Sequence, residues 1–198
     1  MNTLLFPGQG SQFVGMGFEL YNKFDTVKKI FKEADEKLNF SLTELIIHGP
    51  EDKLKLTENT QPAILTVSFS IFKILKEEFN INFNNFKYFA GHSLGEYTAL
   101  VCSGALDFKD AIYFLNERGK AMQAAVPVGK GSMIAVLGTE INDIQNLIMT
   151  SKNNNGICEI ANDNADGQII LSGSKERIES FQLELKDKKI KSIPLKVS

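Results

Sequence analysis

A glycine-flanked serine constrains this chain more than any other feature. The run Gly91-His92-Ser93-Leu94-Gly95 follows an apolar and aromatic segment and precedes apolar residues with helical spacing. A G-x-S-x-G pattern between a buried strand and a helix is typical of a nucleophile elbow, a strained turn that exposes the serine hydroxyl. Glycines are needed there because a Cβ would collide with the neighbouring strand or helix. The pattern predicts an α/β fold in which Ser93 carries an acyl ester, and its alternative is an ordinary turn.

Composition limits the classes of partner and compartment. The 198 residues, 43% of them hydrophobic, suffice for one large domain or two small ones. A net charge of −2 argues against nucleic acid as the main partner. No apolar run approaches the roughly 18 residues of a membrane helix, and the first residues lack the features of a secretory signal. Cys102 and Cys158 lie far apart with no histidine at ligand spacing, which predicts free thiols, no metal site and a cytoplasmic location.

The hydrophobic pattern changes after Pro127. We expect an α/β body over residues 1–128, which holds Ser93, and a small subdomain with a return strand over residues 129–198. The second part has the predicted order β-α-β-β-α-β, the split βαβ arrangement of a ferredoxin-like unit. The expected elements include a strand over residues 3–6, a helix over 27–38, a helix that Thr60 caps and that ends before Asn80, a helix that Asp107 caps, and two strands, 157–161 and 168–171, joined by a turn over 162–167.

Three motifs in collinear order carry a family resemblance. They are Phe6-Pro7-Gly8-Gln9-Gly10-Ser11-Gln12, the serine motif extended through Glu96 and Tyr97, and Glu117-Arg118-Gly119-Lys120-Ala121-Met122-Gln123. Together with Thr60-Gln61-Pro62-Ala63 and the stretch from Asn162 to Gly173, they closely resemble malonyl-CoA:acyl-carrier-protein transacylases. The resemblance implies a hydrolase-like parallel-sheet body, incomplete here, with an inserted ferredoxin-like α+β subdomain. It also implies transfer of malonyl from coenzyme A to the thiol of acyl carrier protein in fatty-acid biosynthesis. The substrates would be malonyl-CoA and the phosphopantetheinyl carrier protein, and no cofactor is expected.

The resemblance assigns roles to five positions. Ser93 is the nucleophile, and the backbone N–H groups of Gln9 and Leu94 form the oxyanion hole, where one donor is typically worth ~10²–10³ in rate. Arg118 binds the free carboxylate of the malonyl group, and Asn162 belongs to the substrate cleft.

Arg118 has a physical reason for its assigned role. A guanidinium can hold a carboxylate through two parallel hydrogen bonds, and an unpaired cation disfavours neutral acyl chains. The ordinary alternative is an arginine that reaches solvent or pairs with Glu117 or Asp110.

A general base is missing from the expected machinery. A serine nucleophile normally needs a histidine, and the chain has only His48 and His92. His92 adjoins Ser93 on the turn, where neighbouring side chains diverge, and His48 is expected at a helix end. In the family the base follows a segment that resembles residues 194–198, so this chain resembles an N-terminal portion. We therefore expect little transfer activity from these residues alone.

Partners and alternatives follow from the same residues. Because acyl carrier proteins are acidic, the basic cluster near the C-terminus is a candidate docking surface, and its alternative is an ordinary solvated face. A serine hydrolase or thioesterase would share the serine turn without needing Arg118, and a catalytically incomplete fragment would only bind coenzyme A or carrier protein. The acyltransferase domain of a polyketide synthase shares the motifs, but we expect a stand-alone monomer. The cluster consists of Lys186, Lys188, Lys189, Lys191 and Lys196.

Overall fold

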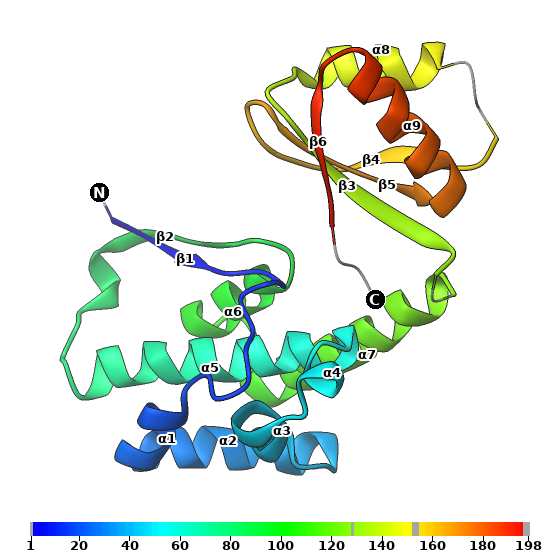
Figure 1. Cartoon of the computed structure of the whole chain (residues 1–198). Coiled ribbons are helices and arrows are strands. Elements are labelled where there is room, and N and C mark those ends of the chain that lie inside the picture. The colour runs from blue at the N-terminus through cyan, green and yellow to red at the C-terminus, as the bar shows by residue number, and fades with distance from the viewer. Residues whose placement is uncertain (1, 128, 152–154, 196–198) are drawn as a thin grey trace. The chain divides into compact units, whose positions relative to one another are not determined.

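The structure is a computed structural model that describes residues 2–127, 129–151 and 155–195. It is a mixed α/β structure with one parallel and one antiparallel sheet (Figure 1). The chain divides into two compact units, Met1–Ala124 and Ala125–Ser198. Among the described residues, no helix is both long and apolar enough to cross a bilayer.

The first unit combines a two-stranded parallel sheet with helices. Strands β1 and β2 pair in parallel, with Phe6 opposite Gly91 at their carboxyl ends. Because these ends coincide, the segments that follow the two strands meet at one edge of the sheet. The elements in chain order are β1 (Asn2–Phe6), α1 (Phe18–Lys23), α2 (Asp25–Leu38), α3 (Leu42–His48), α4 (Glu51–Leu54), α5 (Thr57–Glu77), a 3₁₀ turn (Phe83–Asn85), β2 (Phe86–Gly91), α6 (Leu94–Ser103) and α7 (Phe108–Ala125, whose last residue belongs to the second unit).

Helical periodicity explains how the first unit closes its core. The buried residues of α2 recur at spacings of three and four, so one face packs inward as the sequence predicts. Asp107 Oδ1 accepts hydrogen bonds from the backbone N–H groups of Lys109 and Asp110 and caps α7 as expected. A second apolar cluster joins the sheet to α5 and α6 and includes Phe6, Phe72, Phe83 and Ala99.

The predicted start of α5 at Thr60 is wrong, because the helix begins at Thr57 and carries Pro62 inside it. A proline has no N–H, so the carbonyl of Glu58, four residues earlier, loses its helical donor. Asn116 on α7 replaces that donor, since its Nδ2 donates to the Glu58 oxygen at 3.0 Å. The proline is therefore tolerated as a helix-interior residue, and α5 starts one turn earlier than its proline signal indicates.

The second unit has the order β-α-β-β-α-β that the sequence predicts. Its four strands pair antiparallel in the spatial order β4-β5-β3-β6. An apolar cluster of strand residues and residues from both helices, among them Ile134, Ile144, Leu171 and Phe181, forms its own core. The elements are β3 (Gly131–Leu137), α8 (Ile141–Thr150), β4 (Cys158–Ala165), β5 (Gln168–Ser174), α9 (Lys175–Asp187) and β6 (Lys191–Pro194).

The β4–β5 hairpin is tighter than the sequence predicts. Strand β4 continues to Ala165, so only Asp166 and Gly167 remain between the strands in place of a six-residue turn. Gly167 has φ +70, and an Asp-Gly pair suits a two-residue hairpin turn. The β4–β5 register shifts at two places, one of them between Ile160 and Asn162, so the polar part of β4 pairs with β5 through bulges.

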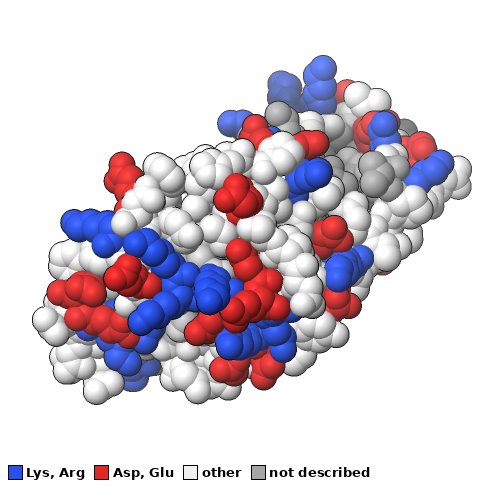
Figure 2. All heavy atoms as spheres, turned by 90° about the horizontal axis from the view of Figure 1, so that it is seen from below, with Lys and Arg blue, Asp and Glu red and all other residues white. Residues whose placement is uncertain are grey.

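Charged side chains of both signs are interspersed on the face shown in Figure 2. Several pairs lie one helical turn apart, such as Lys28 with Asp25 at 2.9 Å and Lys55 with Glu51 at 2.7 Å. Such exposed pairs are screened by solvent and contribute little to stability, so they influence solubility more than the fold.

Candidate active site

Ser93 occupies a strained turn between β2 and α6. Its backbone has φ 55 and ψ −111, a region that non-glycine residues rarely adopt. Ser93 is also exposed to solvent. A Cβ added to Gly91 would lie 2.0 Å from the backbone carbon of Gly95, and one added to Gly95 would lie 2.5 Å from the Phe6 oxygen. The two glycines therefore allow strand, turn and helix to approach closely, and the Ser93 hydroxyl is presented at the strand end.

The loop after β1 lies beside this turn. The His92 N–H donates to the Phe6 oxygen at 3.2 Å, and a Cβ on Gly8 would lie 2.9 Å from the His92 oxygen. Within the loop, the Ser11 hydroxyl donates to the Gly8 oxygen at 3.0 Å. The loop backbone is thus held against the residue that precedes Ser93.

Gln9 and Leu94 therefore lie on the two segments that flank Ser93. Leu94 is the first residue of α6, where backbone N–H groups have no acceptor within the helix and the helix dipole favours negative charge. The Gln9 side chain donates from Nε2 to Thr57 Oγ1 at 3.3 Å, which ties its loop to the start of α5. Their role as oxyanion donors stays a prediction.

Arg118 of α7 contacts Ser93 directly. Its NH2 group donates to Ser93 Oγ at 3.0 Å, and its NH1 group donates to Gln61 Oε1 at 2.7 Å. The guanidinium carbon lies 6.0 Å from the centre of the Tyr97 ring. The half-buried arginine therefore faces the serine hydroxyl together with an amide and an aromatic ring.

The ordinary alternative for Arg118 is a side chain that reaches solvent or pairs with Glu117 or Asp110. Instead, Glu117 pairs with Lys120 at 2.7 Å, and Asp110 lies 3.6 Å from Lys37. Both carboxylates thus have a lysine partner, and Arg118 donates instead to the uncharged Gln61 amide and Ser93 hydroxyl.

A close contact between two helices positions Arg118. A Cβ on the buried Gly119 would lie 2.3 Å from Glu58 Cα, so the backbones of α7 and α5 touch at this point. The same contact sets Arg118 beside Gln61, which is 1% exposed. The motifs in the sequence assign no role to Gln61, although its position within Thr60-Gln61-Pro62-Ala63 is a signal.

The two histidines lie at the expected places. His48 is the last residue of α3, exposed, with its ring 6.5 Å from the Phe18 ring. His92 is exposed beside Ser93, and its Nδ1 would lie 2.6 Å from a Cβ on Gly8. That neither histidine serves as the general base stays a prediction.

Asn162 and the basic cluster belong to the second unit. Asn162 is half-buried in β4, where it pairs with Ile170 of β5. Lys196 lies outside the described residues. The other four lysines of the predicted docking surface are exposed on the last turn of α9, the following loop and the start of β6: Lys186, Lys188, Lys189 and Lys191.

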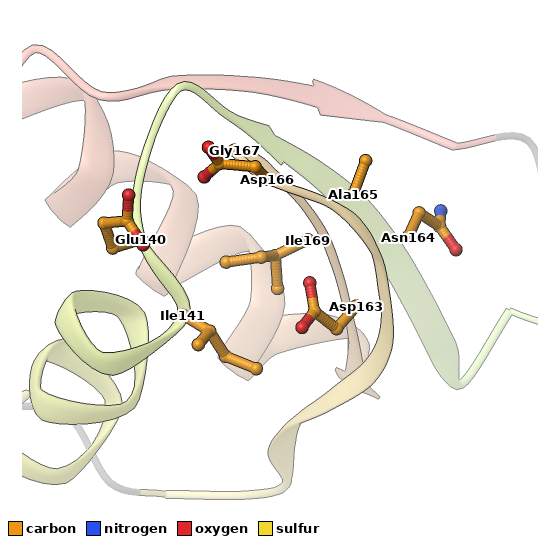
Figure 3. Close-up of a pocket in the computed structure, with 8 residues that line it drawn as sticks. All are labelled: Glu140, Ile141, Asp163, Asn164, Ala165, Asp166, Gly167 and Ile169. Carbon is orange, nitrogen blue, oxygen red and sulfur yellow. The ribbon is translucent and has the colours of Figure 1, made fainter.

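A hollow of about 190 Å³ opens at the β4–β5 hairpin of the second unit. Figure 3 shows the carboxylates of Glu140, Asp163 and Asp166 around Ile169. Three carboxylates disfavour an anionic ligand, so this hollow does not suit a malonyl group or a phosphate. Within the described ranges, no group of three or more His, Cys, Asp or Glu side chains is arranged to hold a metal ion.

The cysteines are not competing nucleophiles. Cys102 and Cys158 are both buried free thiols. Burial raises the pKa of the Cys102 thiol to about 12 and also raises the pKa of Cys158. Both thiols therefore stay protonated at neutral pH and unreactive, because the thiolate is the nucleophilic form.

This chain is similar in sequence and in structure to known proteins. The acyl transferase domain family matches residues 3–196. The malonyl CoA-acyl carrier protein transacylase of Bacillus subtilis is 43% identical over 198 residues, which are 99% of this chain and 61% of that protein. The crystal structure of FabD from Acinetobacter baumannii aligns with a TM-score of 0.91 at 40% identity, over 100% of this chain and 62% of that one.

One matching structure contains a second protein. It is a type II PKS acyl-carrier protein in complex with its malonyl-transacylase, with a TM-score of 0.90 and 39% identity over 99% of this chain and 62% of that one. The chain spans about three fifths of the length of the curated relatives that it matches. These matches confirm the resemblance drawn from the motifs.

Proposed function

Because this chain belongs to the acyl transferase domain family, we propose that it takes part in moving a malonyl group from coenzyme A to the thiol of an acyl carrier protein. Relatives named malonyl CoA-acyl carrier protein transacylases, at 43% and 40% identity, support the substrate. The structure of a malonyl-transacylase with its acyl-carrier protein supports the partner.

The hydrogen bond from Arg118 NH2 to Ser93 Oγ, 3.0 Å long, carries the proposal. In a malonyl ester on Ser93, a single methylene separates the ester carbonyl from the free carboxylate, so the group that binds the carboxylate must lie close to Oγ. Arg118 meets that requirement. A guanidinium has five N–H donors, and the bonds to Gln61 and Ser93 use two of them.

The proposed reaction has two halves. Ser93 Oγ attacks the thioester carbonyl of malonyl-CoA, a C–O bond forms, the C–S bond breaks, and the hydroxyl proton ends on the coenzyme A thiol. The thiol of the carrier protein then attacks the ester carbonyl and restores the serine hydroxyl. In both halves the carbonyl oxygen becomes negative, and the N–H groups of Leu94 and Gln9 are the proposed donors to it.

Arg118 accounts for the choice of acyl group in this scheme. The malonyl carboxylate forms charge-assisted hydrogen bonds with the guanidinium, which an acetyl group cannot form. An acetyl group would instead leave the cation facing a methyl, so discrimination comes from attraction and rejection together.

Mass spectrometry of the carrier protein tests the proposal. After incubation with malonyl-CoA, the phosphopantetheinyl carrier protein should gain one malonyl group, and Ser93→Ala should abolish the gain. Because general-base help is worth ~10²–10⁴ in rate and neither histidine is assigned that role, the assay needs long incubation and stoichiometric enzyme. Release of free malonate without transfer to pantetheine would instead support a serine hydrolase.

The carrier protein is proposed to dock on the exposed lysines of the second unit. Their positive charge complements an acidic partner. Reversing the charge at Lys189 and Lys191 together should raise the KM for carrier protein, most strongly at low salt. An unchanged KM across salt concentrations would exclude this surface.

The finer description of the fold is part of the proposal. The strand order β4-β5-β3-β6 with two helices supports a ferredoxin-like second unit, inserted into a hydrolase-like body to which the β1–β2 pair and the serine turn contribute. The two free thiols support a reducing compartment such as the cytoplasm, and we propose that the protein acts as a monomer.

A further inference from the structure

We propose that Gln61 is the positioning residue of the carboxylate site, and that it holds the Arg118 guanidinium in place without neutralising its charge. The inference rests on the proposed function and deepens it, because it assigns part of the selectivity for carboxylate-bearing acyl groups to a residue that contacts Arg118.

The Gln61 side chain is buried, and its terminal amide is held by contacts on both sides. It is 1% exposed, and its Oε1 accepts the hydrogen bond from Arg118 NH1 at 2.7 Å. Its Nε2 lies 3.3 Å from the sulfur of Met122, a weak acceptor. The amide oxygen is therefore directed at the guanidinium, and water does not compete for it.

The backbone on both sides of this contact is fixed too. Helices α5 and α7 touch at Gly119 and Glu58, and Asn116 of α7 donates to the Glu58 oxygen at 3.0 Å. Gln61 and Arg118 extend from these two helices within one turn of the contact. The distance between the two side chains thus follows from the helix contact and does not depend on a mobile loop.

The guanidinium is held by uncharged groups at three points. NH1 donates to the Gln61 amide, NH2 donates to the Ser93 hydroxyl, and the Tyr97 ring lies 6.0 Å from the guanidinium carbon. Two hydrogen bonds from different nitrogens fix the plane of the guanidinium and its rotation within that plane. A neutral acceptor achieves this orientation while the full positive charge remains available for an anion.

A carboxylate at position 61 would give a different site. Glutamate has nearly the same shape as glutamine, so in Gln61→Glu an oxygen would still accept from NH1, now as a buried ion pair with Arg118. The arginine charge would be compensated before substrate arrives, and a malonyl carboxylate would meet a neutral pair. In Gln61→Met the charge stays available, while the orienting acceptor and the weak contact from Nε2 to the Met122 sulfur are lost.

Binding of unreactive substrate analogues separates these effects. The probes are malonyl-carba(dethia)-CoA and acetyl-carba(dethia)-CoA, in which a methylene replaces the thioester sulfur, so no acyl transfer occurs. Isothermal titration calorimetry gives the Kd of each for the 198-residue chain and its variants. The quantity compared is the ratio of acetyl Kd to malonyl Kd, which cancels contributions from the coenzyme A part.

The ratio of acetyl Kd to malonyl Kd should decrease from wild type to Gln61→Met and decrease further in Gln61→Glu. One hydrogen bond to a charged group is worth about tenfold to a hundredfold in an equilibrium constant, so Gln61→Glu should lower the malonyl preference by about that factor. Gln61→Met should lower it severalfold, with the acetyl Kd unchanged in both variants. Gln12→Glu is the matched control, since it adds the same charge while its Oε1 still accepts from the Gly10 N–H, a 2.8 Å bond in an exposed loop; its ratio should stay within twofold of wild type.

Each outcome decides a different point. A wild-type chain without malonyl preference would overturn the proposed function and this inference with it. A wild-type preference that Gln61→Glu leaves unchanged would overturn the inference alone. Parallel weakening of both ligands in both variants would show a merely structural role and also overturn it. Thermal unfolding monitors folding of each variant, and should Gln61→Glu not fold, the selective severalfold loss in Gln61→Met decides.

Discussion

Replacing Gly119 by alanine tests whether the α5–α7 contact builds the site. In an unconstrained helix this change would stabilise the protein by up to about 1 kcal/mol, because alanine has the higher helix propensity. Here the new Cβ would lie 2.3 Å from Glu58 Cα, 2.5 Å from Glu58 N and 2.7 Å from the Thr57 carbonyl carbon. All three are backbone atoms of α5, so no side chain can rotate away.

The magnitude follows from these distances. Nonbonded carbon atoms sit about 3.5–4.0 Å apart, so the two helices must separate by roughly 1 Å or more. Overpacking of this kind costs about 1–3 kcal/mol, and the rigid neighbours favour the upper end. After the propensity gain is subtracted, we expect Gly119→Ala to lower the free energy of unfolding by about 2 kcal/mol. The displacement would also break the 2.7 Å bond between Arg118 and Gln61.

Urea unfolding followed by circular dichroism measures the change. Ala121→Gly, at an exposed position of the same helix, serves as the control, because it reports the local difference in helix propensity between the two residues. The free energy of unfolding should fall by up to about 1 kcal/mol in the control. It should fall further in Gly119→Ala, although alanine is the better helix former. A Gly119→Ala variant as stable as the wild type, or more stable, would refute the close contact and the positioning argument built on it.

Three further predictions concern single side chains. Arg118→Ala should reduce malonyl transfer about 10²–10⁴-fold more than acetyl transfer, since two charge-assisted hydrogen bonds are lost only with malonyl, and equal losses for the two acyl groups would contradict the carboxylate role. Thr98→Val should raise the free energy of unfolding by about 1 kcal/mol, because the fully buried Thr98 hydroxyl has no hydrogen-bond partner among the described residues; a lower midpoint in thermal unfolding would contradict this. Cys102, whose thiol pKa burial raises to about 12, should react with a disulfide reagent at pH 8 only after unfolding in urea, and rapid reaction of the native chain would show an accessible thiolate.

The local part of the candidate site follows from the sequence. Glycines at positions 91 and 95 around Ser93, between a strand and a helix, predict a strained turn. In such a turn the strand and helix backbones approach so closely that neither position has room for a Cβ. The hydrophobic pattern after Pro127 likewise predicts the order β-α-β-β-α-β of the second unit, since hydrophobic periodicity is a local property.

The long-range contacts do not follow from the sequence. A proline at position 62 indicates a helix start. In the structure, Pro62 lies inside α5, and the Asn116 side chain, from a helix more than fifty residues later, donates to the Glu58 oxygen in its place. The bond between Gln61 and Arg118 depends on that contact as well, so a local pattern cannot reveal it. The extension of β4 to Ala165 depends on pairing with β5, which compensates for polar residues of low strand propensity.

Ser93 is the proposed site of acylation, and Arg118 is proposed to select the acyl group. Prolonged incubation of the chain with an equimolar mixture of malonyl-CoA and acetyl-CoA, followed by peptide mass spectrometry, tests both statements at once. We predict a malonyl ester on the peptide that contains Ser93, a clear excess over the acetyl ester, and loss of that excess in Arg118→Ala. A modification on another residue would contradict the role of Ser93, and equal malonyl and acetyl esters on Ser93 would contradict the role of Arg118.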